Sequence, residues 1–385
     1  MKKILLIDAV LFMAAMLFIY PQNCLDAAKN GLGVWFNIVV PSLLPFMAAS
    51  FILLETGAVR LLAHILSPVT RLLFAAPGES AYVFLASALS GYPVGAKLTA
   101  ELHASKRLSE RDAQALIRFT SVSGPVFLTG AVSVGMLGLP ESGVYLVAAH
   151  YLSAVLVGVV FGLFGRKQMP PRKKVPLRSA LRDFKQDIAV CAPLGTILAA
   201  SVHKAVSTLL KIGGFIIFFF VVMEALAASG FMDVLTRLNA PIARLIGMSA
   251  EDTNALLIGS IEMTAGCSTA AALDTALTQK LSLLCAIIAF GGLCIHMQTH
   301  AVCGEHLKPK HFLLAKSLQA VFAYGICTAS LSLFPLSVYT SSFSAQSKTA
   351  AYTGLVFAAV VLIFLFVVKR AQRSRRRTLT LTRKL

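Results

Sequence analysis

Apolar runs long enough to cross a lipid bilayer recur along this chain of 385 residues, and they restrict its fold more than any other feature. A helix that crosses the hydrocarbon layer needs about 20 mainly apolar residues. The chain is 57% hydrophobic and 14% charged, with a mean hydropathy of +0.77, values that ordinary soluble domains do not reach. We therefore expect an all-α polytopic membrane protein, with spans at residues 4–20, 34–55, 115–138, 143–164, 209–229, 283–304, 312–335 and 350–368.

Two further apolar stretches, around residues 80–100 and 252–275, are interrupted by glycine and polar residues. The first contains "SGYPVGAK" at 90–97. Every backbone polar group in lipid must be hydrogen bonded, so such a break is tolerated only against protein or a water-filled cavity. Both stretches are predicted to be re-entrant hairpins. Residues 187–205 are interpreted as a helix at or near the membrane interface.

Lysine and arginine are concentrated in short blocks between the apolar runs. The blocks at 106–111, 166–185, 308–310 and 369–377 all lie inside the cell if the N-terminus is cytoplasmic. This is the positive-inside pattern, and it predicts that both termini are cytoplasmic. The net charge of +18 therefore indicates membrane topology, and nucleic acid is not expected as a partner.

The two halves of the chain resemble each other at an offset of 173 residues, where 56–74 aligns with 229–247. Each half has a span, then an amphipathic helix suited to the interface plane, then a broken hairpin. The alternative is that these segments are two ordinary amphipathic loops. The first spans of the two halves run in opposite directions, which predicts two inverted repeats, each with an interfacial helix, a re-entrant hairpin and a broken transmembrane helix. Inverted repeats with discontinuous helices are typical of secondary transporters.

Candidate substrate-binding residues of the first half lie in its hairpin and in the following span. Lys97 stands one turn into the second half-helix, where it and the positive helix end suit a carboxylate; alternatively it extends to the headgroups. Pro125 lacks an N–H group, which leaves the Ser121 carbonyl unpaired and predicts a break, although a simple kink is the alternative. The predicted binding residues are Ser90, Gly91, Tyr92, Pro93, Gly95, Lys97, Ser121, Ser123 and Gly124.

The second half offers a matching set. Glu262 is an ionisable residue in an apolar run and is a functional candidate by default; alternatively it pairs with a neighbouring helix. Gly291 and Gly292 permit unwinding, and His296 and Gln298 lie 173 residues beyond the expected break of the first half. His296 could instead be a packing histidine. The predicted binding residues here are Glu262, Thr264, Gly266, Ser268, His296 and Gln298.

Three segments resemble a known family: "PSLLPF" (41–46), "SGYPVGAKLTAEL" (90–102) and "TSVSGP" (120–125). They are similar to the sporulation integral membrane protein YlbJ (SpoVV) family, over about residues 30–340. That family carries the nucleoside-recognition gate domain, which resembles the core of concentrative nucleoside transporters. The resemblance implies a transporter of dipicolinate during spore formation, in the outer forespore membrane or the bacterial cell membrane. It also implies a glutamate that faces the ligand from the second hairpin, and Glu262 matches that position.

The apolar runs, the basic blocks and the resemblance together divide the chain into five expected segments. They are an N-terminal transmembrane helix (1–30), a first gate-like repeat (31–165), a basic cytoplasmic loop with an interfacial helix (166–205), a second, inverted gate-like repeat (206–340), and a C-terminal transmembrane helix with a basic tail (341–385).

Several functional alternatives stay open at this point. A nucleoside or nucleobase transporter, a channel and a non-transporting sporulation scaffold compete with the dipicolinate transporter. An enzyme is not expected, because His296 and His300 lack the adjacent glutamate of a zinc hydrolase helix and the chain has no G-x-S-x-G motif. ATP-driven transport is not expected either, because the chain has no P-loop lysine. The expected partners are the bilayer and a small anionic or nucleoside-like substrate, and a homo-oligomer is an open alternative. No cofactor or metal is expected beyond a coupling proton or sodium ion.

Dipicolinate raises an electrostatic difficulty, because it is a dianion at neutral pH and an ionised Glu262 would repel it. Burial favours the neutral form of a carboxyl group, so Glu262 could be protonated when the substrate is bound. Alternatively it stays charged and holds a coupling cation, or it selects a hydroxylated nucleoside.

Overall fold

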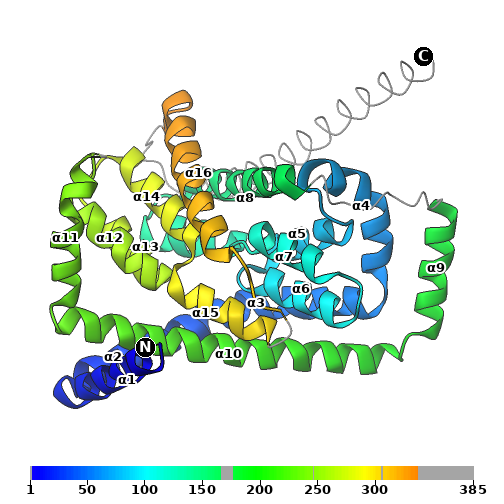
Figure 1. Ribbon diagram of the computed structural model, residues 1–385, viewed down its shortest axis with the longest axis horizontal. Helices are drawn as coiled ribbons and strands as arrows, with labels where there is room; N and C mark the ends of the chain where they lie inside the picture. The colour runs from blue at the N-terminus through cyan, green and yellow to red at the C-terminus, as the bar shows by residue number, and fades with distance from the viewer. Residues whose placement is uncertain (1, 166–176, 246, 305–306, 337–385) are drawn as a thin grey trace.

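The computed structural model describes residues 2–165, 177–245, 247–304 and 307–336, and within these residues every regular element is a helix (Figure 1). The predicted span 350–368 and most of the basic blocks at 166–185 and 369–377 lie outside the described residues. Four of the described helices are long and apolar enough to cross a membrane: Pro140–Leu163, Leu194–Ala228, Leu277–Cys303 and Phe312–Leu333. A fifth span is possible if the pair Val10–Ile19 and Pro21–Asn37, bent by 108°, is taken as one.

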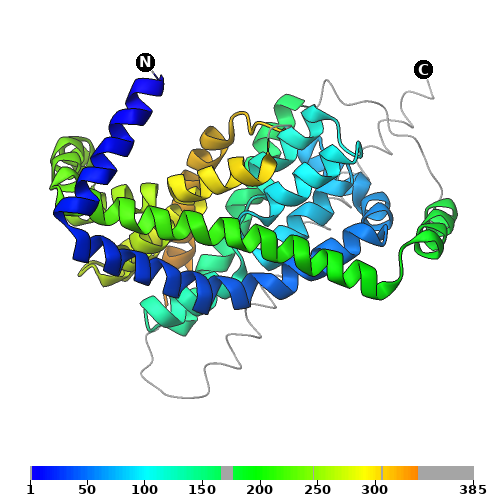
Figure 2. The same ribbon diagram turned by 90° about the horizontal axis from the view of Figure 1, so that it is seen from below.

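The N-terminal helices, residues 2–55, pack against one long helix, residues 194–228, and we call these helices together the frame. Helix α1 (Lys2–Ile19) is followed by α2 (Pro21–Val34), the π-helical turn η1 (Trp35–Val39) and α3 (Val40–Glu55). The last three, α2, η1 and α3, follow one another without a non-helical residue between them. Helix α10 (Leu194–Ala228) packs along α2 and α3, as Figure 2 shows. Its 35 residues correspond to a length of roughly 52 Å.

The continuity of α10 corrects the prediction for residues 187–205. These residues do not form one separate helix, because residues 187–190 are the end of α9 (Leu177–Val190) and Leu194 begins the long helix. Gly213 does not interrupt α10, since its Cα packs against the indole of Trp35, which also donates to the Leu209 carbonyl at 2.9 Å. The expected segment boundaries at 30 and 205 therefore fall inside helices.

The rest of the described chain repeats one order of elements. The first series is α4 (Ala58–Phe74), the pair α5 (Glu79–Ser90) and α6 (Val94–Ala104), the broken pair α7 (Glu110–Thr120) and η2 (Val126–Met136), the short turn η3 (Pro140–Ser142) and α8 (Gly143–Gly165). The second series is α11 (Phe231–Leu245), the pair α12 (Ala250–Ile261) and α13 (Met263–Ala272), the pair α14 (Leu277–Phe290) and α15 (Gly292–Cys303), and α16 (Phe312–Leu333).

The repeated order matches the sequence predictions for most elements. The predicted amphipathic helices are α4 and α11, and the predicted hairpins are the helix pairs α5–α6 and α12–α13. In the predicted span 115–138, residues 121–124 are not helical, which confirms the expected break before Pro125. The inversion of one series relative to the other across a membrane stays a prediction.

The inversion can be tested by accessibility. In a variant without the seven native cysteines, a cysteine in place of Asp183 on α9 should be protected from an impermeant thiol reagent applied to intact cells. A cysteine in place of Arg237 on α11 should react, because the lysine and arginine asymmetry puts these helices on opposite sides of the membrane. Both positions are exposed in the fold. Equal labelling of the two positions would contradict the inverted arrangement.

Candidate functional site

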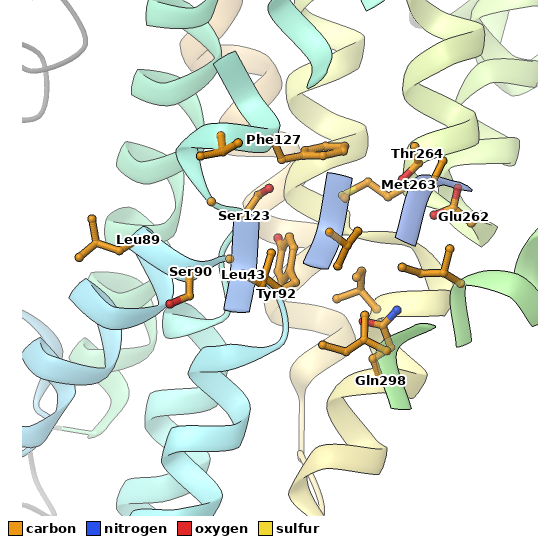
Figure 3. A pocket seen from close by; sticks show the side chains of 18 residues that line it. Leu43, Leu89, Ser90, Tyr92, Ser123, Phe127, Glu262, Met263, Thr264 and Gln298 are labelled. Carbon is orange, nitrogen blue, oxygen red and sulfur yellow. The ribbon is translucent and has the colours of Figure 1, made fainter. Parts of the chain in front are cut away.

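The tips of both hairpins face one pocket, with the first half on one side and the second half on the other (Figure 3). The cavity measures about 70 Å³, which is small compared with the roughly 300–1,000 Å³ of typical ligand sites. A substrate therefore needs the surrounding elements to move apart. Of the predicted binding residues, the pocket is lined by Ser90, Gly91, Tyr92, Ser123, Gly124, Glu262, Thr264 and Gln298.

The first hairpin tip lies directly on the backbone of the adjoining helix break. Gly91 has a left-handed φ of +93°, and a Cβ added there would stand 2.8 Å from the backbone nitrogen of Gly124. A Cβ on Gly124 would in turn stand 3.3 Å from the nitrogen of Gly91. Both glycines are thus required for backbone-to-backbone contact. Tyr151 on α8 reaches both segments, because its hydroxyl lies 2.8 Å from the Ala88 carbonyl and 3.0 Å from the Ser123 carbonyl.

The backbone groups freed by the break find partners on distant helices. The N–H of Ser123 donates to Nε2 of His150 on α8 at 2.8 Å. The Ser121 carbonyl, which Pro125 deprives of its helical donor, accepts from Nζ of Lys316 on α16 at 3.1 Å. The break is therefore a fixed feature of the fold, satisfied by side chains of two other helices.

Lys316 is fully buried and is the centre of a hydrogen-bonded cluster behind the pocket. Besides the Ser121 carbonyl, its ammonium donates to the Tyr92 hydroxyl at 2.6 Å and to Oε1 of Gln319 at 2.6 Å. The Tyr92 hydroxyl donates onward to the Ile288 carbonyl at 3.1 Å, near the end of α14. Tyr92 thus links the first hairpin to the helix that precedes the second break.

The sequence analysis missed Lys316, as well as His150. The signal for Lys316 was present, because it is an ionisable residue inside the predicted span 312–335 and the rule that singled out Glu262 applies to it equally. His150 has no such signal, since its role depends on the Ser123 N–H, 27 residues away in the chain.

The second hairpin presents Glu262 at its tip. Glu262 is the N-cap of α13, and its Oε2 accepts from the Ala265 N–H at 2.7 Å. It is 3% exposed and lines the pocket. A carboxylate is favoured at a helix N-terminus by the free N–H groups and the helix dipole. Glu262 therefore accepts this hydrogen bond from its own hairpin, and not from a neighbouring helix as the alternative proposed.

Gln298 and His296 have different surroundings on α15. Gln298 is buried at the pocket, and its Nε2 donates to Sγ of Cys294 at 3.2 Å. His296 packs between the rings of Phe290 and Phe312 outside the pocket, which agrees with the packing alternative. The offset of 173 residues does not extend to this region, because the helix breaks at Gly291 and both residues lie within α15 beyond it.

The remaining predicted residues lie outside the pocket. Pro93 is the N-cap of α6, and Gly95 packs against the Thr120 carbonyl. Lys97 forms an ion pair with Glu101 at 2.9 Å, so in this structure its ammonium is not directed to the hairpin tip. The other three are Ser121, whose carbonyl binds Lys316, Gly266, which packs against Gly259, and Ser268, which is exposed on α13.

Two polar atoms in the pocket have no partner among the described residues. They are Oγ of Ser90 and Oε1 of Gln298, both buried. A buried polar atom without a partner is costly and is rare in native proteins. Their position at the hairpin tip and on the facing helix is suited to a ligand or ordered water. The apolar remainder of the wall includes residues from the frame that sequence analysis did not identify: Val34, Val39, Leu43, Ile212 and Ile216.

Comparison with known proteins assigns the chain to a family. The family described as Gate, nucleoside recognition, matches residues 36–140 and 209–346. The chain is 34% identical over 332 residues to sporulation integral membrane protein YlbJ of Bacillus subtilis (strain 168), covering 84% of this chain and 81% of that protein. A solved structure of a CNTnw double variant in an outward-facing state is 16% identical, with a TM-score of 0.47 over 85% of this chain and 86% of the other. The chain is an integral membrane protein that belongs to the nucleoside-recognition Gate family, together with YlbJ.

Proposed function

We propose that this protein is a secondary transporter of a small organic solute, with dipicolinate in spore formation as the leading candidate. The observation that carries the proposal is the convergence of both hairpin tips on one pocket inside the helical bundle. Discontinuous helices that meet around a cavity are the usual construction of a transporter substrate site. A non-transporting scaffold has no use for such breaks, since each one leaves backbone groups that need special partners.

The first half of the pocket favours an anion. Helix α6 begins at Val94 and η2 at Val126, so two helix N-termini adjoin the pocket from this half. Helix N-termini attract negative charge, and the buried ammonium of Lys316 lies directly behind Tyr92. Apolar walls on the frame helices suit a flat aromatic ring. Dipicolinate combines such a ring with carboxylates.

A nucleoside is the second candidate, and the second half of the pocket favours it. Glu262 can accept hydrogen bonds from hydroxyl groups of a ribose, and Oε1 of Gln298 has no protein partner. The same groups hinder a dianion if Glu262 is ionised. The choice between the two candidates therefore depends on the charge of Glu262 during transport.

Uptake into vesicles separates the candidates. Purified protein in liposomes should accumulate radiolabelled dipicolinate more than uridine or adenosine under an imposed ion gradient. Empty liposomes provide the background. A preference for a nucleoside would replace the leading candidate by the second one, and an absence of uptake for all three compounds would contradict the transporter proposal.

Gly91→Ala should abolish uptake while the protein still inserts in the membrane. The new Cβ would lie against the backbone of Gly124 at a φ that side chains rarely adopt, so the hairpin tip must move off the helix break. Gly130→Ala on η2 is the matched control, because its Cβ would meet only Val126 Cγ1 at 3.9 Å. Uptake by the Gly91→Ala protein equal to that of the control would show that the tip geometry is not needed.

Glu262→Gln tests the charge at the second tip. The amide oxygen can still accept from the Ala265 N–H, so the cap and the fold should persist. If dipicolinate is carried with a neutral Glu262, the variant should keep substantial uptake and show less dependence on pH. If Glu262 binds a cation or a ribose as a carboxylate, the loss of a charge-assisted contact worth about 1.5–3 kcal/mol should lower affinity roughly ten- to hundredfold.

Uptake of both substrates by wild type and Glu262→Gln protein, measured between about pH 5.5 and pH 8, distinguishes these outcomes. A variant that matches wild type for every substrate and pH would show that Glu262 serves only as the cap of α13.

A further inference from the structure

The Nζ atom of Lys316 is buried among neutral hydrogen-bond acceptors. Its side chain is fully buried, and no ion pair joins it to any carboxylate in the part of the chain that the structure describes. A protonated lysine has three donors and no acceptor, and the three donors match the Tyr92 hydroxyl, Gln319 Oε1 and the Ser121 carbonyl. A desolvated charge inside a membrane protein is costly and is usually retained for function.

The Lys316 ammonium lies at the end of α7, a position that suits a coupling cation. Unwound carbonyls and the C-terminal ends of half-helices coordinate the coupling ions of transporters with broken helices. Ser121 is the C-cap residue of α7, and its carbonyl is the one that Pro125 frees. Because the Lys316 ammonium already binds this oxygen, a sodium ion would have to displace it.

Loss of a proton from Lys316 changes the hydrogen bonds that its amino group can make. The neutral amine has two donors and one lone pair. Gln319 Oε1 and the Ser121 carbonyl can only accept, so the lone pair must receive the Tyr92 hydroxyl hydrogen. That hydrogen is the one that Tyr92 donates to the Ile288 carbonyl in the structure. Deprotonation therefore breaks the link between the first hairpin tip and α14.

We propose that Lys316 is the coupling group of this protein, so that protons, and not sodium ions, drive the transport that the proposed function assigns to it. A proton binds to the Lys316 amine, the O–H···N contact with Tyr92 becomes N–H···O, and the Tyr92 hydroxyl turns to Ile288. The first hairpin tip is then tied to the end of α14. Release of the proton reverses these changes, and no other bond is made or broken.

The groups that face Lys316 are uncharged or can only carry a positive charge, apart from the phenol of Tyr92, which is neutral as a hydrogen-bond donor. The titratable groups that face it are the phenol of Tyr92 from the hairpin, the imidazole of His150 from α8 and the imidazole of His296 from α15. Nε2 of His150 accepts from the Ser123 N–H, so this ring is neutral with its hydrogen on Nδ1.

Besides Gln319 Oε1, the remaining neighbours of Lys316 are backbone carbonyls. Helix α7 contributes the Ser121 carbonyl, and α14 contributes the Ile288 carbonyl through Tyr92. None of these groups supplies a negative charge.

An anionic substrate supplies the missing charge. An anion at the first hairpin tip lies close to Lys316, because Tyr92 lines the pocket and contacts the ammonium. The anion stabilises the protonated amine, and by linkage the protonated amine strengthens binding of the anion to the same extent. Substrate and proton are thereby carried together.

Transport assays provide the first test. Wild type protein in liposomes should accumulate dipicolinate when the outside is acidic, with no loss when choline replaces sodium, and the external pH should rise as substrate enters. Lys316→Met should lose the stimulation by the pH gradient. Its exchange of dipicolinate across the membrane at equal pH should also weaken, because methionine lacks the charge that favours the anion and the donor that binds the Ser121 carbonyl. Lys308→Met, at an exposed position before α16, should behave as wild type.

Hydrogen–deuterium exchange provides a second test that needs no substrate. In wild type and Lys308→Met protein, exchange at residues 90–94 and 288–292, corrected for the intrinsic pH effect, should rise about threefold or more from about pH 6 to about pH 9 as one buried hydrogen bond is lost. Lys316→Met and Tyr92→Phe should show no such rise. Lys316→Arg, which stays charged, should remain protected at both pH values and also lose the pH-gradient stimulation.

The proposal fails if Lys316→Met still accumulates dipicolinate in response to the pH gradient, if wild type accumulation requires sodium, or if the rise in exchange persists in Lys316→Met. If wild type protein moves neither dipicolinate nor a nucleoside, the transporter function fails, and the exchange experiment alone decides whether Lys316 controls the Tyr92 link.

Discussion

The Ser121 carbonyl cannot be hydrogen bonded within its own helix, because Pro125 has no N–H group to donate to it. Inside a membrane such an oxygen must find another donor, and here the donor is the buried ammonium of Lys316. Because the same ammonium also holds Tyr92, the position of the first hairpin tip depends on how this one carbonyl is satisfied. The tip can then rest on the break through the contact of Gly91 with Gly124.

The two halves satisfy their breaks in different ways, which gives the pocket its polarity. The first break depends on side chains from other helices, above all a lysine. At the second hairpin the Glu262 carboxylate caps α13, and Gly292 permits α15 to begin close to the carbonyls of Gly259 and Ile261. One half therefore contributes the Lys316 amino group behind its tip, and the other contributes the Glu262 carboxyl group at its tip. A repeat in the order of elements is thus compatible with a site that binds an asymmetric molecule.

Sequence alone predicted the features that depend on local chemistry. Proline and glycine placed the breaks, apolar length placed the long helices, and an ionisable residue in an apolar run marked Glu262. It did not predict the partners of the breaks, because His150 and Lys316 meet residues 121–123 only after the helices have packed. It also divided α10 into two parts, an interfacial helix at 187–205 and a span at 209–229. Packing against Trp35 and along α2 and α3 keeps that helix continuous.

Access to the pocket requires motion between the hairpins and the frame, because α3 and α10 close one wall of a cavity too small for a ring compound. An ion-pair cluster spans this boundary: Lys204 on α10 lies 2.7 Å from Glu55 on α3 and 4.0 Å from Glu101 on α6, which also pairs with Lys97. Lys204 and Glu55 are more than a third exposed, and such pairs contribute only about 0–1 kcal/mol each. The cluster can therefore break and re-form as the first hairpin moves, whereas in our proposal the buried contacts of Lys316 change when a proton is exchanged.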